Sequence, residues 1–273
     1  MIHDLIGAVL LPRCSDFSWF HLLPGIGDGA LGHALHLAHA GEAFTVPAAW
    51  TVVVLTLGLA LLGRAGLRAA LAREGAEKYV PDATLTPRNA LELFVGTFYE
   101  LMEGVLGKKD APIYFPLVAT LFCYVLASNL IGLLPGMLPP TEIFSHNAAM
   151  AICVFLVFNY VGLQRNGFAY IKHLGGTMPL MFPFLFFIEL FGLLIRPFTL
   201  SLRLAANMYA DHLVVGVSRE LGGTFLGAVG SVLVPIPFYG LGLFVCLIQA
   251  FVFSLLTAIY IALAAADMRG HHH

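Results

Sequence analysis

The stretch from Leu221 to Ala266 contains no Asp, Glu, Lys or Arg. It is more than twice as long as the roughly 20 apolar residues that one helix needs to cross a bilayer core of about 30 Å. A straight helix of that length would extend far beyond the membrane. The stretch therefore has to tilt steeply, kink or fold back, and Pro235 and Pro237 are the candidate bends.

Charge is scarce along the whole chain. Charged residues make up 11% of the sequence and apolar residues 59%, whereas about a quarter of the residues in a soluble domain are charged. We therefore predict an all-α integral membrane protein. The net charge of -2 and the few basic residues exclude a nucleic-acid-binding protein. The four cysteines lie far apart without a CxxC spacing, so we predict neither a disulfide framework nor a zinc site. We also expect no cofactor and no bound metal.

Apolar segments predict about five membrane-embedded helices. Residues 1–42 form an external N-terminal segment, and residues 43–72 form the first transmembrane helix. Residues 111–163 form a pair of transmembrane helices joined by the Pro- and Gly-containing turn at 133–140. Residues 177–268, which include the uncharged stretch, form two long helices.

Three segments are predicted to lie outside the membrane core. Residues 73–110 form a charged cytoplasmic loop, residues 164–176 a second one, and residues 269–273 a tail that ends in the histidines of a possible purification tag. The first loop contains an amphipathic helix that lies on the membrane surface. Its apolar residues recur at helical spacing: Leu91, Phe94, Phe98, Leu101, Met102 and Val105.

The basic residues set the orientation. With five spans, Arg13 and Arg219 fall on one side. The other side receives Arg64, Arg68, Arg73, Lys78, Arg88, Lys108, Lys109, Arg165, Lys172 and Arg269. The positive-inside rule then places the N-terminus outside and the C-terminus in the cytoplasm. The first 45 residues show no signal or transit peptide pattern, and we expect a bacterial inner membrane rather than an organellar one.

Five ionisable residues interrupt the apolar segment from Thr177 to Ser218. They are Glu189, Arg196, Arg203, Asp211 and His212. An ionisable group inside a membrane costs from about 3 to more than 10 kcal/mol and marks a functional site by default. Arg203 is the stronger candidate for a deep position because its neighbours in the chain are apolar, whereas Arg196 can extend towards the headgroups.

Helical spacing arranges these groups around Arg203. Asn207 shares its face, Asp211 follows one turn later, and His212 points the opposite way. Arginine cannot relay a proton, but at ~4 Å and an effective dielectric constant of ~20 it attracts a carboxylate by about 4 kcal/mol. Glu189, Asp211 and His212 can exchange protons with water. The pattern indicates proton binding and release on a partner, with no covalent bond broken on this chain.

Plainer roles remain open for single residues. Arg203 could pair with a helix C-terminus or a lipid phosphate, Glu189 could cap a neighbour, and His212 could be a packing residue. Gln249 is expected to face Arg203 or to line water, since an amide that faces lipid would be unsatisfied. The external histidines His33, His36 and His39 could bind metal, although ordinary loop histidines are the simpler interpretation.

Several motifs resemble those of one family. Ser201 to His212 (SLRLAANMYADH) resembles the signature of subunit a of the rotary F-type ATP synthase. Asn129 to Pro135 (NLIGLLP), Phe187 to Glu189, Arg196 to Leu200 (RPFTL) and Gln249 to Tyr260 are similar to further motifs of that family, in its order and spacing.

The resemblance implies a proton-translocating stator subunit beside a rotating ring of c subunits. It also implies peripheral-stalk b subunits and other F0F1 subunits as partners, within a lipid bilayer. Arg203 would face the ring carboxylate and separate two offset half-channels. Glu189, Asn207, His212 and Gln249 match positions that the family uses near these paths, and residues 177–268 would form a tilted hairpin against the ring.

The sequence departs from the family pattern at three places. Ala205 and Ala206 replace the commoner Phe-Gly pair, and Asp211 stands where a small residue is usual. Gly242 stands where many members place a His or Glu partner for the position of His212. We expect Asp211 and His212 to act together there, with water filling the gap. Secondary candidates for the site are Asn129, Glu142 and Arg196.

Two other classes of protein fit less well. A secondary transporter or channel would also place charges at the midplane, but it should show two similar halves, and this sequence shows none. A structural membrane scaffold leaves the deep arginine unexplained. Nucleotide chemistry on this chain is excluded because Gly104 to Lys109 lacks the spacing of a phosphate-binding loop.

Overall fold

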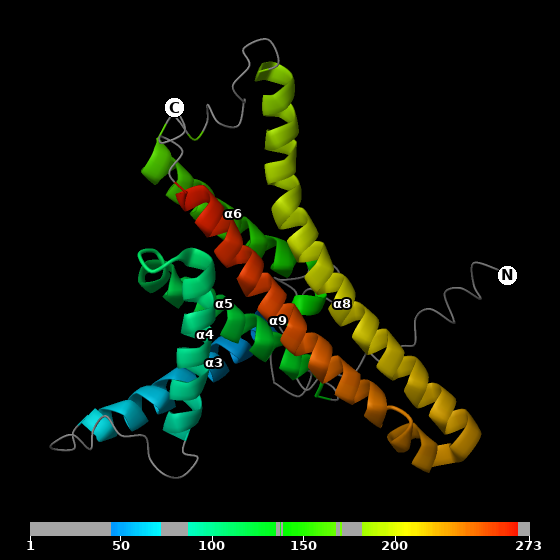
Figure 1. The fold of residues 1–273 in the computed structure, drawn as a ribbon. Coiled ribbons are helices and arrows are strands. Elements are labelled where there is room, and N and C mark those ends of the chain that lie inside the picture. The colour runs from blue at the N-terminus through cyan, green and yellow to red at the C-terminus, as the bar shows by residue number, and fades with distance from the viewer. Residues whose placement is uncertain are drawn as a thin grey trace, which may run out of the picture. The chain divides into compact units, whose positions relative to one another are not determined.

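The computed structural model describes residues 45–71, 87–134, 137, 139–167, 170 and 182–266 (Figure 1). The helices are α3 (Thr45–Leu71), α4 (Pro87–Leu106), α5 (Ala111–Gly132), the short 3-10 helix η4 (Pro140–Glu142), α6 (Phe144–Asn166), α8 (Phe182–Leu233) and α9 (Ile236–Ala265). The predicted all-α class is confirmed.

Four predicted features lie outside the described residues. These are the external segment 1–42 with its three histidines, the part of the charged loop 73–110 that precedes residue 87, most of the loop at 164–176, and the tail at 269–273.

Four helices of the described part can cross a membrane by length and composition. They are α3 over Val46–Gly66, α5 over its whole length, α6 and α9. Helix α8 is longer than any of these, with 52 residues, and it carries the ionisable residues that the sequence placed inside the membrane. The apolar helices confirm a membrane protein.

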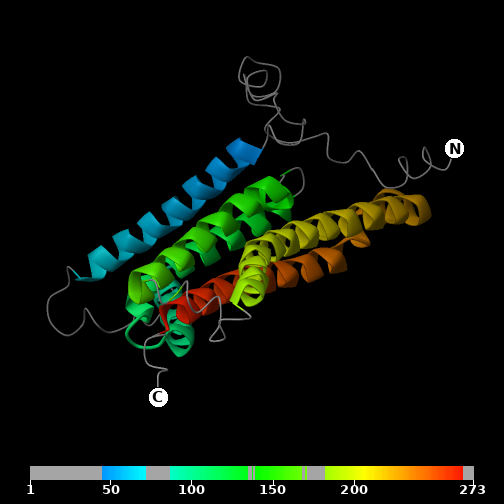
Figure 2. The ribbon, with the colours of Figure 1, turned by 90° about the horizontal axis from the view of Figure 1, so that it is seen from above.

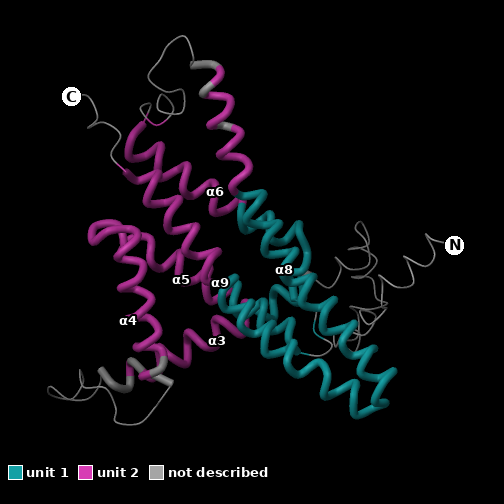
Figure 3. Tube along the Cα trace, turned by 45° about the vertical axis from the view of Figure 1, so that its right-hand side comes forward, with its two compact units in different colours: residues 1–52, 125–151, 197–250 teal, residues 53–124, 152–196, 251–273 magenta. Residues whose placement is uncertain are grey.

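The chain divides into two compact units (Figure 3). Unit 1 contains residues 1–52, 125–151 and 197–250, and unit 2 contains residues 53–124, 152–196 and 251–273. Unit 1 includes the turns that join α5 to α6 and α8 to α9. Unit 2 includes the turn that joins α4 to α5, and the end of α6.

Within unit 1, α8 and α9 lie side by side, as Figure 2 shows. Leu200, Leu204 and Met208 recur every fourth residue on α8 and are buried. Cys246 and Ala250 have the same spacing on α9 and are also buried. Residues four apart share a helix face, so each helix buries one apolar stripe.

The uncharged stretch folds back at Gly227, whose backbone angles are φ 63° and ψ −150°. Only glycine adopts this conformation without strain. A Cβ atom at Gly222 would collide with the backbone of Gly230, and a Cβ atom at Gly230 with that of Gly222. The predicted doubling back thus occurs at glycines. Pro197 lies inside α8, and Pro235 lies in the turn before α9.

Within unit 2, α4 packs against α5 through aromatic rings. The ring centroid of Phe98 lies 4.9 Å from that of Phe122 and 6.0 Å from that of Phe115, and Phe94 stacks on Phe98 at 5.7 Å. The predicted amphipathic helix is therefore present. Its apolar face is covered in part by α5, although Leu101 is exposed.

Arg165 and Asn166, at the end of α6, bind two neighbouring helix ends in unit 2. The Arg165 guanidinium forms a two-bonded ion pair with the Asp110 carboxylate, just before α5. The Asn166 side-chain amide donates hydrogen bonds to the carbonyl oxygens of Ala264 at 3.3 Å and Ala266 at 2.9 Å. These carbonyls at the end of α9 have no intrahelical donor, so Asn166 satisfies them.

Candidate functional site

Arg203 lies on the surface of unit 1. Its neighbours Leu200 and Leu204 are buried, whereas the Arg203 side chain is exposed. Among the described residues, no carboxylate lies within ion-pair distance of its guanidinium. The Arg203 guanidinium is thus exposed to the surroundings of α8.

Small residues surround Arg203 on the same face of α8. Thr199, Ala206 and Ala210 stand four residues before, three after and seven after it, and all three are exposed. Positions at these spacings share a helix face. Small residues let a second helix approach closely in a membrane, so this face leaves room for another helix.

One helical turn after Arg203, an amide pair joins α8 to α9. Nδ2 of Asn207 donates a hydrogen bond of 2.8 Å to Oε1 of Gln249. Gln249 is only 4% exposed, and its Nε2 has no hydrogen-bond partner in the described part of the chain. The sequence predicted that Gln249 would face Arg203 or line water, and the structure gives it Asn207 as a direct partner.

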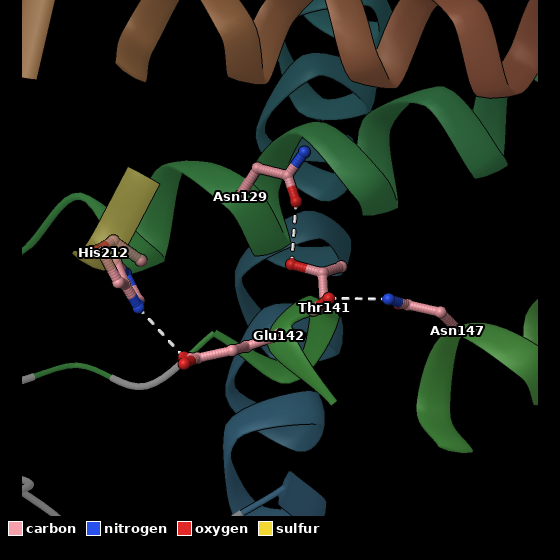
Figure 4. A network of polar contacts seen from close by, with 6 residues as sticks. Asn129, Thr141, Glu142, Asn147 and His212 are labelled. Carbon is pink, nitrogen blue, oxygen red and sulfur yellow. Dashed lines mark hydrogen bonds and ion pairs between the residues drawn. The ribbon is translucent and has the colours of Figure 1, made fainter. Parts of the chain in front are cut away.

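His212 is bound on both ring nitrogens. Its Nδ1 lies 2.9 Å from Oε2 of Glu142, and its Nε2 lies 2.9 Å from the carbonyl oxygen of Gly132 at the end of α5 (Figure 4). The His212 and Glu142 side chains are 28% and 23% exposed. Glu142 was a secondary candidate in the sequence, and the structure makes it the partner of His212.

A buried network of polar side chains holds the segment that carries Glu142 (Figure 4). Oγ1 of Thr141 donates to Oδ1 of Asn129 at 2.8 Å, and Nδ2 of Asn147 donates to the carbonyl oxygen of Thr141 at 2.6 Å. All three residues are at most 1% exposed. Asn129, another secondary candidate, therefore positions Glu142 through Thr141.

Gly132 and Gly242 lie in this part of unit 1, where an added side chain would meet neighbouring atoms. A Cβ atom at Gly132 would collide with the side chains of Met208 and Pro139, so these two side chains pack directly against a glycine. A Cβ atom at Gly242 would lie 3.9 Å from Oδ2 of Asp211 and 3.0 Å from Cδ2 of Leu133. Asp211 therefore faces the space beside Gly242.

Unit 2 holds a second group, formed by Glu189, Arg196 and Tyr260. Nη2 of Arg196 lies 3.9 Å from Oε1 of Glu189, and both side chains are partly exposed. The Arg196 guanidinium also lies over the ring of Tyr260, 5.3 Å from its centroid, a cation–π contact. Arg196 is thus held by an aromatic ring, and Glu189 is open to its surroundings.

Sequence reasoning found most of these residues but missed three. Thr141 and Asn147 went unnoticed, although a threonine and an amide that flank the only charge of the 111–163 segment are a usable signal. Tyr260 ends a motif that had been singled out, but no role had been given to it. A phenol near the end of a mostly apolar helix is a usable signal for one.

Known proteins match most of this chain. The family described as ATP synthase A chain matches residues 46–262. ATP synthase subunit a of Geobacter sulfurreducens is 39% identical over 227 residues, which cover 83% of this chain and 89% of the relative. ATP synthase subunit a of Bdellovibrio bacteriovorus is 36% identical over 255 residues, which cover 92% and 98%. The chain therefore belongs to the ATP synthase A chain family, the proton-translocating stator subunits of the F0 sector.

Proposed function

We propose that Arg203 faces the carboxylate of a ring of c subunits that turns past this chain. The exposed guanidinium, without a carboxylate at ion-pair distance among the described residues, is the observation that carries this proposal. An unpaired arginine in a membrane costs at least about 3 kcal/mol, so a partner with the opposite charge is needed. The small residues Thr199, Ala206 and Ala210 would let a ring helix approach.

Arg203 keeps the facing carboxylate ionised and cannot itself pass a proton. At ~4 Å and an effective dielectric constant of ~20 the attraction is about 4 kcal/mol. A carboxylate therefore loses its proton when it meets Arg203, and the proton cannot continue through a guanidinium. The arginine thus separates two half-channels that are offset along α8.

The polar residues of unit 1 form the outer half-channel. His212, Asp211 and Asn207 follow one another along α8 towards Arg203, and Gln249 joins from α9. The Nε2 group of Gln249 is buried and has no hydrogen-bond partner within the described part of the chain. The basic residues of the sequence place the turns of unit 1 outside the membrane, which makes this half-channel the external one.

The second group, in unit 2, forms the inner half-channel. Glu189 is more than half exposed and can exchange protons with water. Arg196, held over Tyr260, stands next to it, with its Nη2 3.9 Å from Oε1 of Glu189. The same orientation places the connections of unit 2 in the cytoplasm, where protons leave the ring.

This path couples proton flow to rotation. A membrane potential of 100 mV supplies about 2.3 kcal/mol for each proton, and each proton that enters or leaves the ring moves it by one c subunit. The peripheral-stalk b subunits hold this chain still against the ring. We place the assembly in a bacterial inner membrane, with the N-terminus outside and the C-terminus in the cytoplasm.

The test is Arg203→Ala in the complete ATP synthase, reconstituted in vesicles. We expect ATP-driven proton pumping to be lost and the passive proton leak through F0 to persist or rise. Arg219→Ala removes an exposed arginine of the same helix and serves as the control, with pumping unchanged. Full pumping by Arg203→Ala would reject the proposal.

A further inference from the structure

We propose that Glu142 and His212 form a pair that carries a single proton in the outer half-channel, with the acid supplied by the α5–α6 turn. The role of an outer half-channel rests on the proposed function above. The pair itself rests on the 2.9 Å contact between Nδ1 of His212 and Oε2 of Glu142. On α9, Gly242 offers no side chain, and the acid comes from Glu142 instead.

Hydrogen-bond chemistry fixes how many protons the pair holds. A carbonyl oxygen can only accept, so Nε2 of His212 carries a hydrogen and donates it to the carbonyl of Gly132. The contact between Nδ1 and the Glu142 carboxyl group then requires one proton between them. That proton resides either on Nδ1, opposite a carboxylate, or on the carboxyl group, opposite a neutral ring.

Both partners are held from outside the pair. Gly132 ends α5, where helix carbonyls lack an intrahelical donor, and its oxygen fixes the orientation of the imidazole ring. Thr141, bonded to Asn129 and Asn147, fixes the residue next to Glu142. The two side chains are still 28% and 23% exposed. A fixed and partly accessible site can take a proton from water without rearranging.

Asp211 is the next acceptor along α8. Its carboxylate faces Gly242, 3.9 Å from the place of a Cβ atom there. A proton released by the pair therefore meets a carboxylate one residue closer to Arg203, and then the Asn207 and Gln249 amides. The proton moves from water to the pair and on to Asp211, and no other bond changes.

Other titratable groups lie close to this path. Asp211 acts electrostatically on His212 and on Cys246 of α9. Among the described residues, Glu142 and Asp211 are therefore the carboxylates that act on the charge of His212. Any pH profile of proton conduction through the pair reports these groups together.

The test uses the complete ATP synthase in vesicles with Glu142→Gln. Glutamine has the same size and can donate to Nδ1 of His212, but it cannot take up or release a proton. We expect the rate of ATP-driven pumping to fall by about 10-fold or more, while assembly and ATP hydrolysis by detached F1 stay unchanged. Glu142→Asp should recover part of the rate with a shifted pH profile of proton conduction through F0. Glu220→Gln, an exposed carboxylate of α8, is the matched control.

A double-variant cycle separates a shared step from two independent ones. Glu142→Gln combined with His212→Gln should pump no more slowly than the worse single variant. Multiplied losses would overturn the pair. Wild-type pumping by Glu142→Gln would also overturn it and would leave the proposed function intact, because that function fails only if Arg203→Ala pumps. If Glu142→Gln does not assemble, Glu142→Asp decides: an unchanged pH profile rejects the pair.

Discussion

Nδ2 of Asn207 donates a 2.8 Å hydrogen bond to Oε1 of Gln249, which joins α8 to α9 one helical turn after Arg203. Both residues belong to unit 1. The bond fixes the spacing between α8 and α9 close to the point where the Arg203 side chain extends from the surface of unit 1. It leaves the buried Nε2 donor group of Gln249 without a partner among the described residues.

Gln249→Leu should slow pumping and weaken the assembled complex. It leaves the half-buried Asn207 amide without its acceptor, at a cost below the roughly 1–3 kcal/mol of a fully buried unpaired amide. Asn207→Leu should act in the same way. The double variant should be more stable than either single one, since removal of both partners is nearly neutral. Thermal inactivation of the complex measures stability, and two singles as stable as wild type would refute the coupling.

Gly227→Ala should destabilise the reversal of α8. The positive φ of 63° costs a residue with a Cβ atom about 1–3 kcal/mol. Gly240→Ala is the control, because a Cβ atom there meets nothing within 4 Å. The recovery of this chain in the assembled complex is the measurement, and equal recovery of both variants would contradict the prediction.

Glu189→Gln should slow proton conduction without loss of assembly. The Glu189–Arg196 pair is partly exposed at 3.9 Å, and such pairs stabilise a protein by less than about 1 kcal/mol. Passive proton flux through F0 and the amount of complex are measured together. Glu92→Gln, an exposed carboxylate of α4, serves for comparison. A parallel loss of assembled complex would indicate a structural role for Glu189 instead.

Arg165→Ala should lower the stability of unit 2 by about 1 kcal/mol, and the size of this effect should fall as the salt concentration rises. The Arg165–Asp110 pair is two-bonded, but the Arg165 side chain is 37% exposed, so salt screens it. Lys108→Ala removes a nearby exposed cation and should have no effect. Denaturation midpoints at low and high salt test this. A large effect that salt does not reduce would show that the pair is worth more than its exposure implies.

The helices of this fold could be predicted from the sequence because each membrane-embedded helix must satisfy its own backbone. Length and lack of charge were enough to place α3, α5, α6 and α9. The reversal at Gly227 could not be predicted in the same way. A glycine within an apolar run also fits a continuous helix, and only the contact between Gly222 and Gly230 shows that the chain folds back there.

The site was predicted in part. Residues near one another in sequence, such as Arg203, Asn207 and Asp211, follow helical spacing. The contact between His212 and Glu142 could not be predicted in this way, because Glu142 lies 70 residues earlier and sequence spacing carries no information on such a contact. Because Gly242 has no side chain, the sequence indicated that His212 lacks a partner on α9. The prediction placed Asp211 and water there, and it did not include Glu142.

The exposed guanidinium of Arg203 also has a consequence for biogenesis. On the proposed function, α8 keeps an uncompensated cation in lipid until a ring of opposite charge binds, at a cost of at least about 3 kcal/mol. Binding to the ring removes that cost, so the ring stabilises the inserted chain by mass action. We expect cells that make the chain without the ring to degrade it, and the order of assembly to follow from a single side chain.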